Sequence, residues 1–143
     1  MIKKIDLQYL LSYFGLIPFL LIILDKYFFF QLKEEIINNF IIYYSLLILV
    51  FIGAINWNFE SKVKNYIVIY GFFPSLFSTL IIILNLYKFN SSFLIILIVI
   101  FLFIQLFSDY MLLYLNNRNK NVFYFLRFPL SVIIIFIISI TIL

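Results

Sequence analysis

Five long apolar stretches, separated by short polar breaks, account for most of the sequence. The stretches cover roughly residues 7–24, 38–59, 66–87, 92–115 and 122–143, and the breaks read DKYFFFQLKEE, ESKVKN, YKFNSS and NNRNKN. A helix that crosses a bilayer needs about 20 mostly apolar residues. Backbone polar groups in lipid must be satisfied within such a helix. The pattern therefore predicts an all-α integral membrane protein, with residues 1–143 forming a single bundle of about five transmembrane helices.

Composition supports this class. The chain has 143 residues, of which 66% are hydrophobic and 11% are charged. Soluble domains are about half apolar and about a quarter charged. A chain this short has too much surface to hide so much apolar material in one water-soluble core. The surplus is expected to face the lipid bilayer.

Two missing residue types narrow the chemistry. The sequence has no cysteine and no histidine, which removes thiolate ligands, the commonest metal ligand and the usual general base. We expect no metal, no cofactor and no enzyme activity. The net charge of +4 comes from scattered basic residues, whereas a nucleic-acid partner would need a basic stripe. No nucleic-acid partner is expected.

Lysine and arginine predict the orientation, because cytoplasmic segments are enriched in them. One side receives Lys3, Lys4, Lys62, Lys64, Arg118, Lys120 and Arg127, and the other receives Lys26, Lys33 and Lys88. The first stretch lacks a small-x-small cleavage signature and is interpreted as an uncleaved helix. The prediction is a cytoplasmic N-terminus and, after five helices, a C-terminus on the opposite side.

With this topology, the polar residues inside the stretches fall in the inner half of the bundle. Residues three, four and seven apart share a helical face, so each stretch contributes one polar patch. The candidate inner-half cluster consists of Gly53, Asn56, Trp57, Glu60, Ser75, Ser78, Gln105, Asp109 and Arg127.

Each candidate has a structural and a functional interpretation. Asp109 and Arg127 either form a pair that locks the fourth and fifth helices together or line a polar cavity that opens inward, with Glu60 as a competing partner for Arg127. Asn56 and Glu60 are either helix-end residues at the interface or ligand contacts. Trp57 is interpreted as an interfacial anchor, as aromatic residues favour that depth.

The marked positions also follow a familiar order along the chain. YFGLIPF, FIGAINW, YGFFPSL, FIQLFSDY and LRFPLSV occur in sequence, and the set resembles the domain of unknown function 3429 family, whose members include transmembrane protein 69-like small multi-pass membrane proteins. The resemblance covers about residues 9–140. It implies a multi-pass inner-membrane protein and no established activity. The family pattern around FIGAINW usually has a second glycine and a basic or imidazole residue, where this sequence has Ala54 and Asn56.

Two functions are compatible with these features. The first is a non-catalytic inner-membrane protein that acts as an accessory or assembly partner of a larger membrane complex. The alternative is a small transporter or channel subunit with a polar vestibule on its cytoplasmic half, which would need an oligomer because five helices are few for a monomeric transporter. The expected partners are the bilayer and either other membrane-protein subunits or further copies of the chain. The expected location is the bacterial inner membrane, or the mitochondrial inner membrane if the source is eukaryotic.

Overall fold

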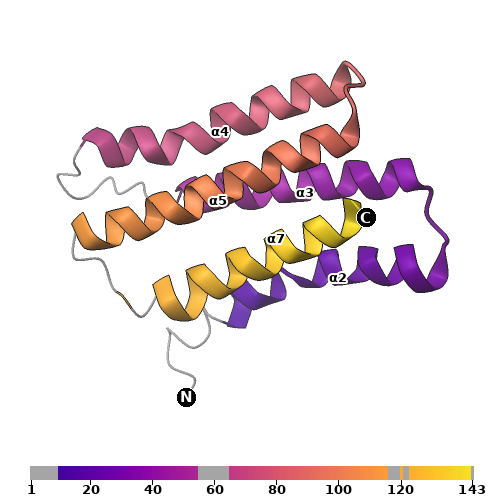
Figure 1. Ribbon diagram of the computed structural model, residues 1–143, viewed down its shortest axis with the longest axis horizontal. Coiled ribbons are helices and arrows are strands. Elements are labelled where there is room, and N and C mark those ends of the chain that lie inside the picture. The colour runs from indigo at the N-terminus through magenta and orange to yellow at the C-terminus, as the bar shows by residue number, and fades with distance from the viewer. Residues whose placement is uncertain (1–9, 55–64, 116–119, 121–122, 143) are drawn as a thin grey trace. The chain divides into compact units, whose positions relative to one another are not determined.

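The regular elements in the described part of the chain are all helical. A computed structural model describes residues 10–54, 65–115, 120 and 123–142 (Figure 1). Its elements are α2 (Ile17–Leu24), η1 (Asp25–Phe29), α3 (Glu34–Ala54), α4 (Asn65–Leu86), α5 (Ser91–Leu115), η2 (Phe123–Arg127) and α7 (Phe128–Ile142), where η1 and η2 are π-helical turns. No strand occurs within these ranges. Five helical spans are long and apolar enough to cross a membrane, which confirms the predicted fold class.

The spans overlap all five predicted stretches and differ from them most around the first polar break; predicted residues 7–9 and 55–59 lie outside the described part of the chain. They cover Leu10–Phe29, Glu34–Ala54, Asn65–Leu86, Ser91–Leu112 and Phe123–Thr141. The first span continues five residues beyond its predicted end at residue 24, and α3 begins four residues before its predicted start at residue 38. The break between the first two spans is therefore only residues 30–33.

Asp25 and Lys26 stay helical because their polar groups find partners. The Asp25 Oδ2 atom accepts a hydrogen bond from the Leu32 amide at 2.9 Å. The Lys26 Nζ atom donates to the Thr141 carbonyl at 2.6 Å. Asp25 and Lys26 therefore remain within the last turn of the first span, although their charges suggested a helix end. Each side chain has a backbone hydrogen-bond partner, so neither is left without one in an apolar environment.

The first span is interrupted near its start. The Gly15 and Leu16 amides bond to the Ser12 and Tyr13 carbonyls at 3.2 and 3.0 Å, which is the tight i to i+3 pattern of a 3₁₀ turn. Helix α2 then begins at Ile17, with Pro18 in its first turn. Proline has no N–H to continue the preceding helix and is best tolerated at this position.

The chain consists of two compact units. The terminal unit comprises Met1–Ile37 and Val99–Leu143, and the central unit comprises Asn38–Ile98. The buried apolar side chains of the central unit are Ile41, Ile42, Leu46, Leu49, Ile52, Ile81, Leu94, Ile95 and Ile98. Those of the terminal unit include Phe19, Leu102, Phe123, Ile134, Ile135 and Ile138. The prediction of a single bundle stays a prediction.

In the central unit, α3 and α4 meet in a regular antiparallel register. The Asn85 side chain donates to Asn39 Oδ1 at 3.1 Å, and the Ser78 hydroxyl reaches the Leu46 carbonyl at 3.5 Å. A Cβ atom added to Gly53 would lie 2.7 Å from the Gly71 carbonyl oxygen.

These three contacts recur every seven residues, at positions 39, 46 and 53 of α3 and at positions 85, 78 and 71 of α4. That spacing is typical of the seam between two helices in a coiled coil, and small residues along it let the backbones approach closely. We call these six residues the α3–α4 seam.

In the terminal unit, the first span runs parallel to the last one. The Tyr13 hydroxyl donates to the Phe125 carbonyl at 2.8 Å, near the beginning of both spans. The Tyr27 hydroxyl donates to the Ile140 carbonyl at 2.9 Å, near the end of both. Helices α2 and α7 lie side by side between these contacts (Figure 1). An odd number of spans requires this parallel arrangement of the first and the last.

Candidate functional site: the Asp109–Arg127 ion pair

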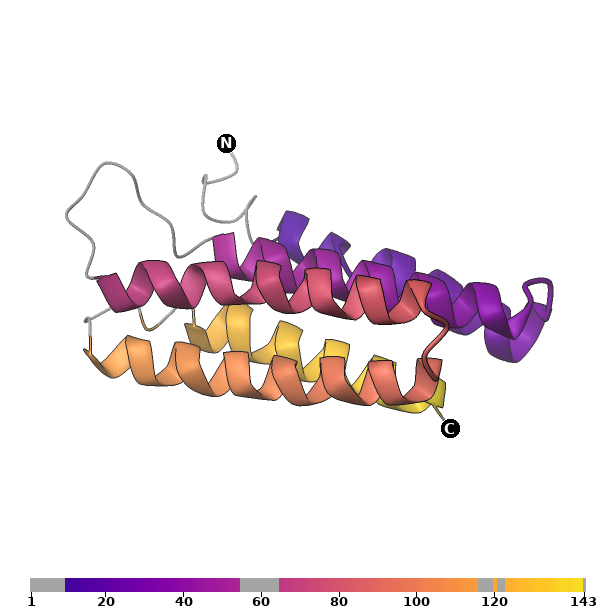
Figure 2. The ribbon, with the colours of Figure 1, turned by 90° about the horizontal axis from the view of Figure 1, so that it is seen from above.

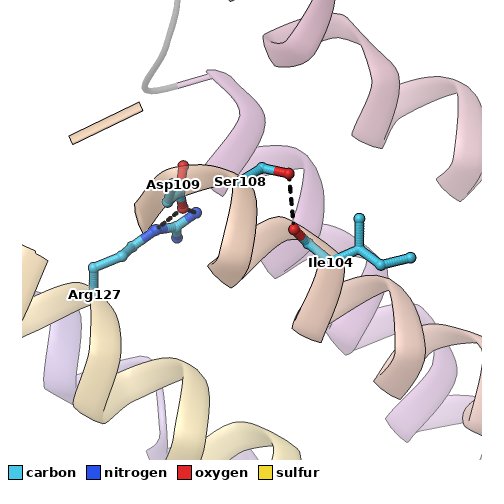
Figure 3. A network of polar contacts seen from close by, with 4 residues as sticks. All are labelled: Ile104, Ser108, Asp109 and Arg127. Atoms are coloured by element: carbon cyan, nitrogen blue, oxygen red, sulfur yellow. Dashed lines mark hydrogen bonds and ion pairs between the residues drawn. The ribbon is translucent and has the colours of Figure 1, made fainter. Parts of the chain in front are cut away.

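Asp109 and Arg127 form an ion pair between α5 and η2. The Arg127 Nε atom donates to Asp109 Oδ2 at 2.6 Å, and the Nη2 atom of the same guanidinium contacts that oxygen as well. Figure 3 shows the guanidinium directed at the carboxylate. The Asp109 side chain is 8% exposed and that of Arg127 is 18% exposed. Each charge thus lies in a largely apolar environment with its opposite charge beside it.

The position of Arg127 follows from local structure. It is the last residue of η2, and Pro129 is the second residue of α7. Proline cannot donate an amide hydrogen bond to the carbonyl four residues earlier, which here is that of Phe125. The Tyr13 hydroxyl donates to this carbonyl instead. The turn that carries Arg127 is therefore supported from the first span.

Aromatic contacts hold the same two elements together beside the ion pair. Phe123, which is buried, lies 5.9 Å from the Tyr110 ring, centroid to centroid, on α5. It also packs edge-on against Tyr124 at 5.4 Å. Aromatic pairs at such distances and tilted geometries are favourable beyond the area they bury. We refer to Asp109, Tyr110, Phe123 and Arg127 as the α5–η2 joint.

Three serine hydroxyls near the candidate cluster bond to helix carbonyls. Ser75 bonds to the Phe72 carbonyl at 2.7 Å within α4, and Ser108 bonds to the Ile104 carbonyl at 2.9 Å within α5 (Figure 3). Ser78 reaches across to Leu46 in the α3–α4 seam. Hydroxyls in apolar surroundings commonly satisfy themselves in this way.

Gly53 serves as a contact point for backbone packing. Its missing side chain leaves room for α4, because an added Cβ would also lie 2.9 Å from Pro74 Cγ. Pro74 itself is buried in the interior of α4, nine residues after its start. Gly53, Gly71 and Pro74 thus form a close contact between the two helices.

The predicted cluster is distributed over both units. Of its nine members, Gly53, Ser75 and Ser78 belong to the central unit, whereas Gln105, Asp109 and Arg127 belong to the terminal unit. Gln105 is buried one helical turn before Asp109. Asn56, Trp57 and Glu60 lie outside the described residues. The structure thus joins Asp109 with Arg127, and places Gly53 and Ser78 on one seam.

Sequence reasoning missed the contacts of the first span and the asparagine pair. Lys26 and Tyr27 bond to carbonyls at the end of α7, where the last four carbonyls of a helix have no intrahelical partner. Asn85 was not included in the predicted inner-half cluster. Its side-chain amide donates to Asn39 and to the Tyr43 hydroxyl, the latter at 3.0 Å. The spacing of Gly71, Ser78 and Asn85 by seven residues was the signal that could have revealed the seam.

One comparison with known proteins matches nearly the whole chain to a family. No curated protein and no solved structure matches the chain. A family model described as protein of unknown function (DUF3429) matches residues 6–143. The match covers nearly the whole sequence, including all five spans. The chain therefore belongs to the DUF3429 family of proteins of unknown function.

Proposed function

We propose that this membrane protein has no catalytic chemistry and acts as an accessory or assembly partner of a larger membrane complex. The observation that supports this proposal is the use of its polar groups. The Asp109–Arg127 pair, the bonds of Tyr13 and Lys26, and the asparagine pair of the seam all connect one helix to another. These groups stabilise the fold, as expected of a protein whose polar residues are structural.

The lipid-facing surface is the part of such a protein that partner helices would contact. Large apolar side chains are exposed on every span, including Leu21, Phe51, Ile69, Phe107 and Phe136. The first span has Phe19 as its buried apolar residue, while Leu10, Leu11, Phe14, Ile17, Leu20, Leu21 and Leu24 are exposed. Within a bilayer, helices associate through close packing and hydrogen bonds rather than through the hydrophobic effect.

The proposed location is the bacterial inner membrane, or the mitochondrial inner membrane in a eukaryote, with the N-terminus on the cytoplasmic or matrix side. Seven basic residues are assigned to that side and three to the other. This bias supports the orientation because positively charged segments are retained on the cytoplasmic side.

Gentle purification from native membranes tests the role. We expect the wild-type protein to be recovered at fixed stoichiometry with other membrane subunits. Asp109→Asn and Arg127→Ala should reduce the yield of the complex in proportion to the folded protein that remains, because these residues act through the fold.

The competing outcome is transport. A homo-oligomer alone, with substrate flux in vesicles that is lost in Asp109→Asn while that variant still folds, would overturn the accessory role. That result would instead support a channel or transporter subunit whose polar residues face a water-filled path.

A further inference from the structure

Two turns of the chain expose aromatic side chains next to charged residues. In the first, Phe28, Phe29 and Phe30 are 72%, 64% and 75% exposed. In the second, between α4 and α5 (Figure 2), Leu86, Tyr87 and Phe89 are 70%, 81% and 52% exposed. We call these two sets the aromatic turns. Each belongs to a different unit and is built independently.

Both aromatic turns contain a residue in a left-handed backbone conformation. Phe30 has φ 51° and Lys88 has φ 56°, and these are the non-glycine residues with positive φ in the described part of the chain. Such a conformation is disfavoured for any residue with a Cβ atom. The backbone is held in place by hydrogen bonds, so the side chains project in a defined direction.

Those hydrogen bonds are specific in each case. The Phe30 amide donates to the Asp25 carbonyl at 2.7 Å, and the Leu32 amide donates to the Asp25 carboxylate. After α4, the Lys88 and Phe89 amides donate to the Asn85 and Leu84 carbonyls at 2.9 and 3.1 Å. The second pattern is a Schellman motif with lysine where glycine is usual.

The first aromatic turn is also tied down from behind. Lys26 and Tyr27, which directly precede it, bond to the last turn of α7. None of the three phenylalanine rings has a ring contact with another residue in the described ranges. The protein therefore anchors this turn through its polar residues and leaves its apolar rings outside its own core.

We propose that the aromatic turns seat in the bilayer at the boundary between headgroups and acyl chains. The first turn continues directly from the span Leu10–Phe29 and is followed by exposed Lys33, Glu34 and Glu35. Apolar rings placed between a membrane span and exposed charges have the depth of the interface, where aromatic residues concentrate. Lys33 and Lys88 can extend toward the headgroup phosphates from the same turns.

The order of spans assigns both turns to one side of the membrane. One follows the first span and the other follows the third, and successive spans alternate in direction. We assign lipid as the occupant of both turns, because aromatic side chains between a span and exposed charges are typical of the membrane interface. This inference is independent of any partner complex.

Single-tryptophan variants test the depth of the turns. Trp57 is the only tryptophan, so Trp57→Phe gives a background into which Phe29→Trp or Tyr87→Trp is introduced. Phe103→Trp, in the middle of α5 and exposed, supplies a matched deep reference. Each variant is reconstituted, without other proteins, into phosphatidylcholine vesicles brominated either near the headgroup or near the chain end.

We expect the tryptophans of the turns to be quenched more strongly by the shallow bromines, and the reference to be quenched more strongly by the deep ones. A water-like emission that acrylamide quenches and neither lipid affects would overturn the proposal. So would the same depth as the reference. Quenching that changes with the protein-to-lipid ratio would indicate a second copy of the chain and would also overturn it. Circular dichroism checks that each variant is folded. If Phe29→Trp misfolds, Phe28→Trp replaces it in the same measurement.

Discussion

At the scale of single residues, replacing one member of the Asp109–Arg127 ion pair is predicted to destabilise the protein, because the other member remains as a buried charge. Arg127→Gln removes the partner of a carboxylate that is 8% exposed. Breaking a buried ion pair by removing one partner typically costs ~3–5 kcal/mol. We expect the lower end of this range, because Arg127 is partly exposed. The free energy of unfolding in mixed micelles, titrated with SDS, measures the loss.

The matched control for this prediction removes both charges. Asp109→Asn with Arg127→Gln leaves two neutral amides that can still bond to each other. We expect this double variant to lose less stability than either single variant. Equal or greater loss in the double variant would mean that the two side chains do not interact.

Gly53 gives a second prediction at the residue scale. Gly53→Ala places a methyl group 2.7 Å from the Gly71 carbonyl oxygen, so α3 and α4 must separate. Overpacking of this kind costs ~1–3 kcal/mol. The neighbouring Ala54 is exposed, and Ala54→Leu should be nearly neutral in the same SDS titration. Equal effects at both positions would contradict the close approach.

How far single residues could be predicted depended on where their partners lie in the chain. The pairing of Asp109 with Arg127 was predictable, because the two spans are consecutive and opposite charges in lipid require each other. The serine hydroxyls were harder to interpret. Ser75 was predicted to belong to the polar cluster, but its hydroxyl bonds to a carbonyl of its own helix, as that of Ser108 also does. Every helical sequence offers such a carbonyl equally.

At the scale of elements, the contact of Tyr13 with the Phe125 carbonyl yields a two-residue test. Tyr13→Phe removes the donor to a carbonyl that Pro129 leaves without its helical amide. Hydrogen bonds between membrane helices are worth about 1 kcal/mol, and we expect a loss of this size. In a Pro129→Ala background the new amide can serve the carbonyl, so Tyr13→Phe should cost less there.

A double-mutant cycle of unfolding free energies measures that difference. Tyr27→Phe provides the control, because its acceptor is the Ile140 carbonyl at the other end of α7. Its cost should not change when Pro129 is replaced. If Tyr13→Phe cost the same free energy of unfolding in both backgrounds, the Tyr13 hydroxyl would not be compensating for the amide that Pro129 lacks.

Helix boundaries show why elements were only partly predictable. The last three spans begin within a residue of their predicted starts, because each start coincides with a sharp change from polar to apolar sequence. The first break was misjudged. Asp25 and Lys26 looked like a helix end, yet their partners are the Leu32 amide and the Thr141 carbonyl. The Thr141 carbonyl lies 115 residues from Lys26, and a partner so distant in sequence leaves no trace in local composition.

At the scale of the whole molecule, the parallel first and last spans predict that the two termini lie on opposite sides of the membrane. The chain contains no cysteine, so single-cysteine variants need no further engineering. With a membrane-impermeant maleimide, Gln31→Cys and Lys88→Cys should be labelled from the outer side. Lys120→Cys should react only after the membrane is opened. Labelling of Lys120→Cys in intact cells together with Lys88→Cys would contradict the five-span topology.

The membrane class and the number of spans were the most predictable features of the whole molecule. Each span carries its own signal of about 20 apolar residues, which does not depend on the rest of the fold. The α3–α4 seam and the contacts of the first span depend on which helices meet. Close packing and isolated polar groups determine which helices pair, and these features give only a weak signal in a single sequence.

The contacts of Tyr13, Lys26 and Tyr27 have a consequence for how the protein is made. Their acceptors lie 112, 115 and 113 residues later in the chain, and ribosomes add about 5–20 residues per second. The first span therefore waits roughly 6–23 seconds in the membrane before its partner is synthesised. Asn85 and Ser78 find their acceptors only 46 and 32 residues away. In a nascent chain that stops before its last helix, α3 and α4 could already pack together, but Tyr13, Lys26 and Tyr27 of the first span would lack these acceptors. Membrane quality control removes products of this kind.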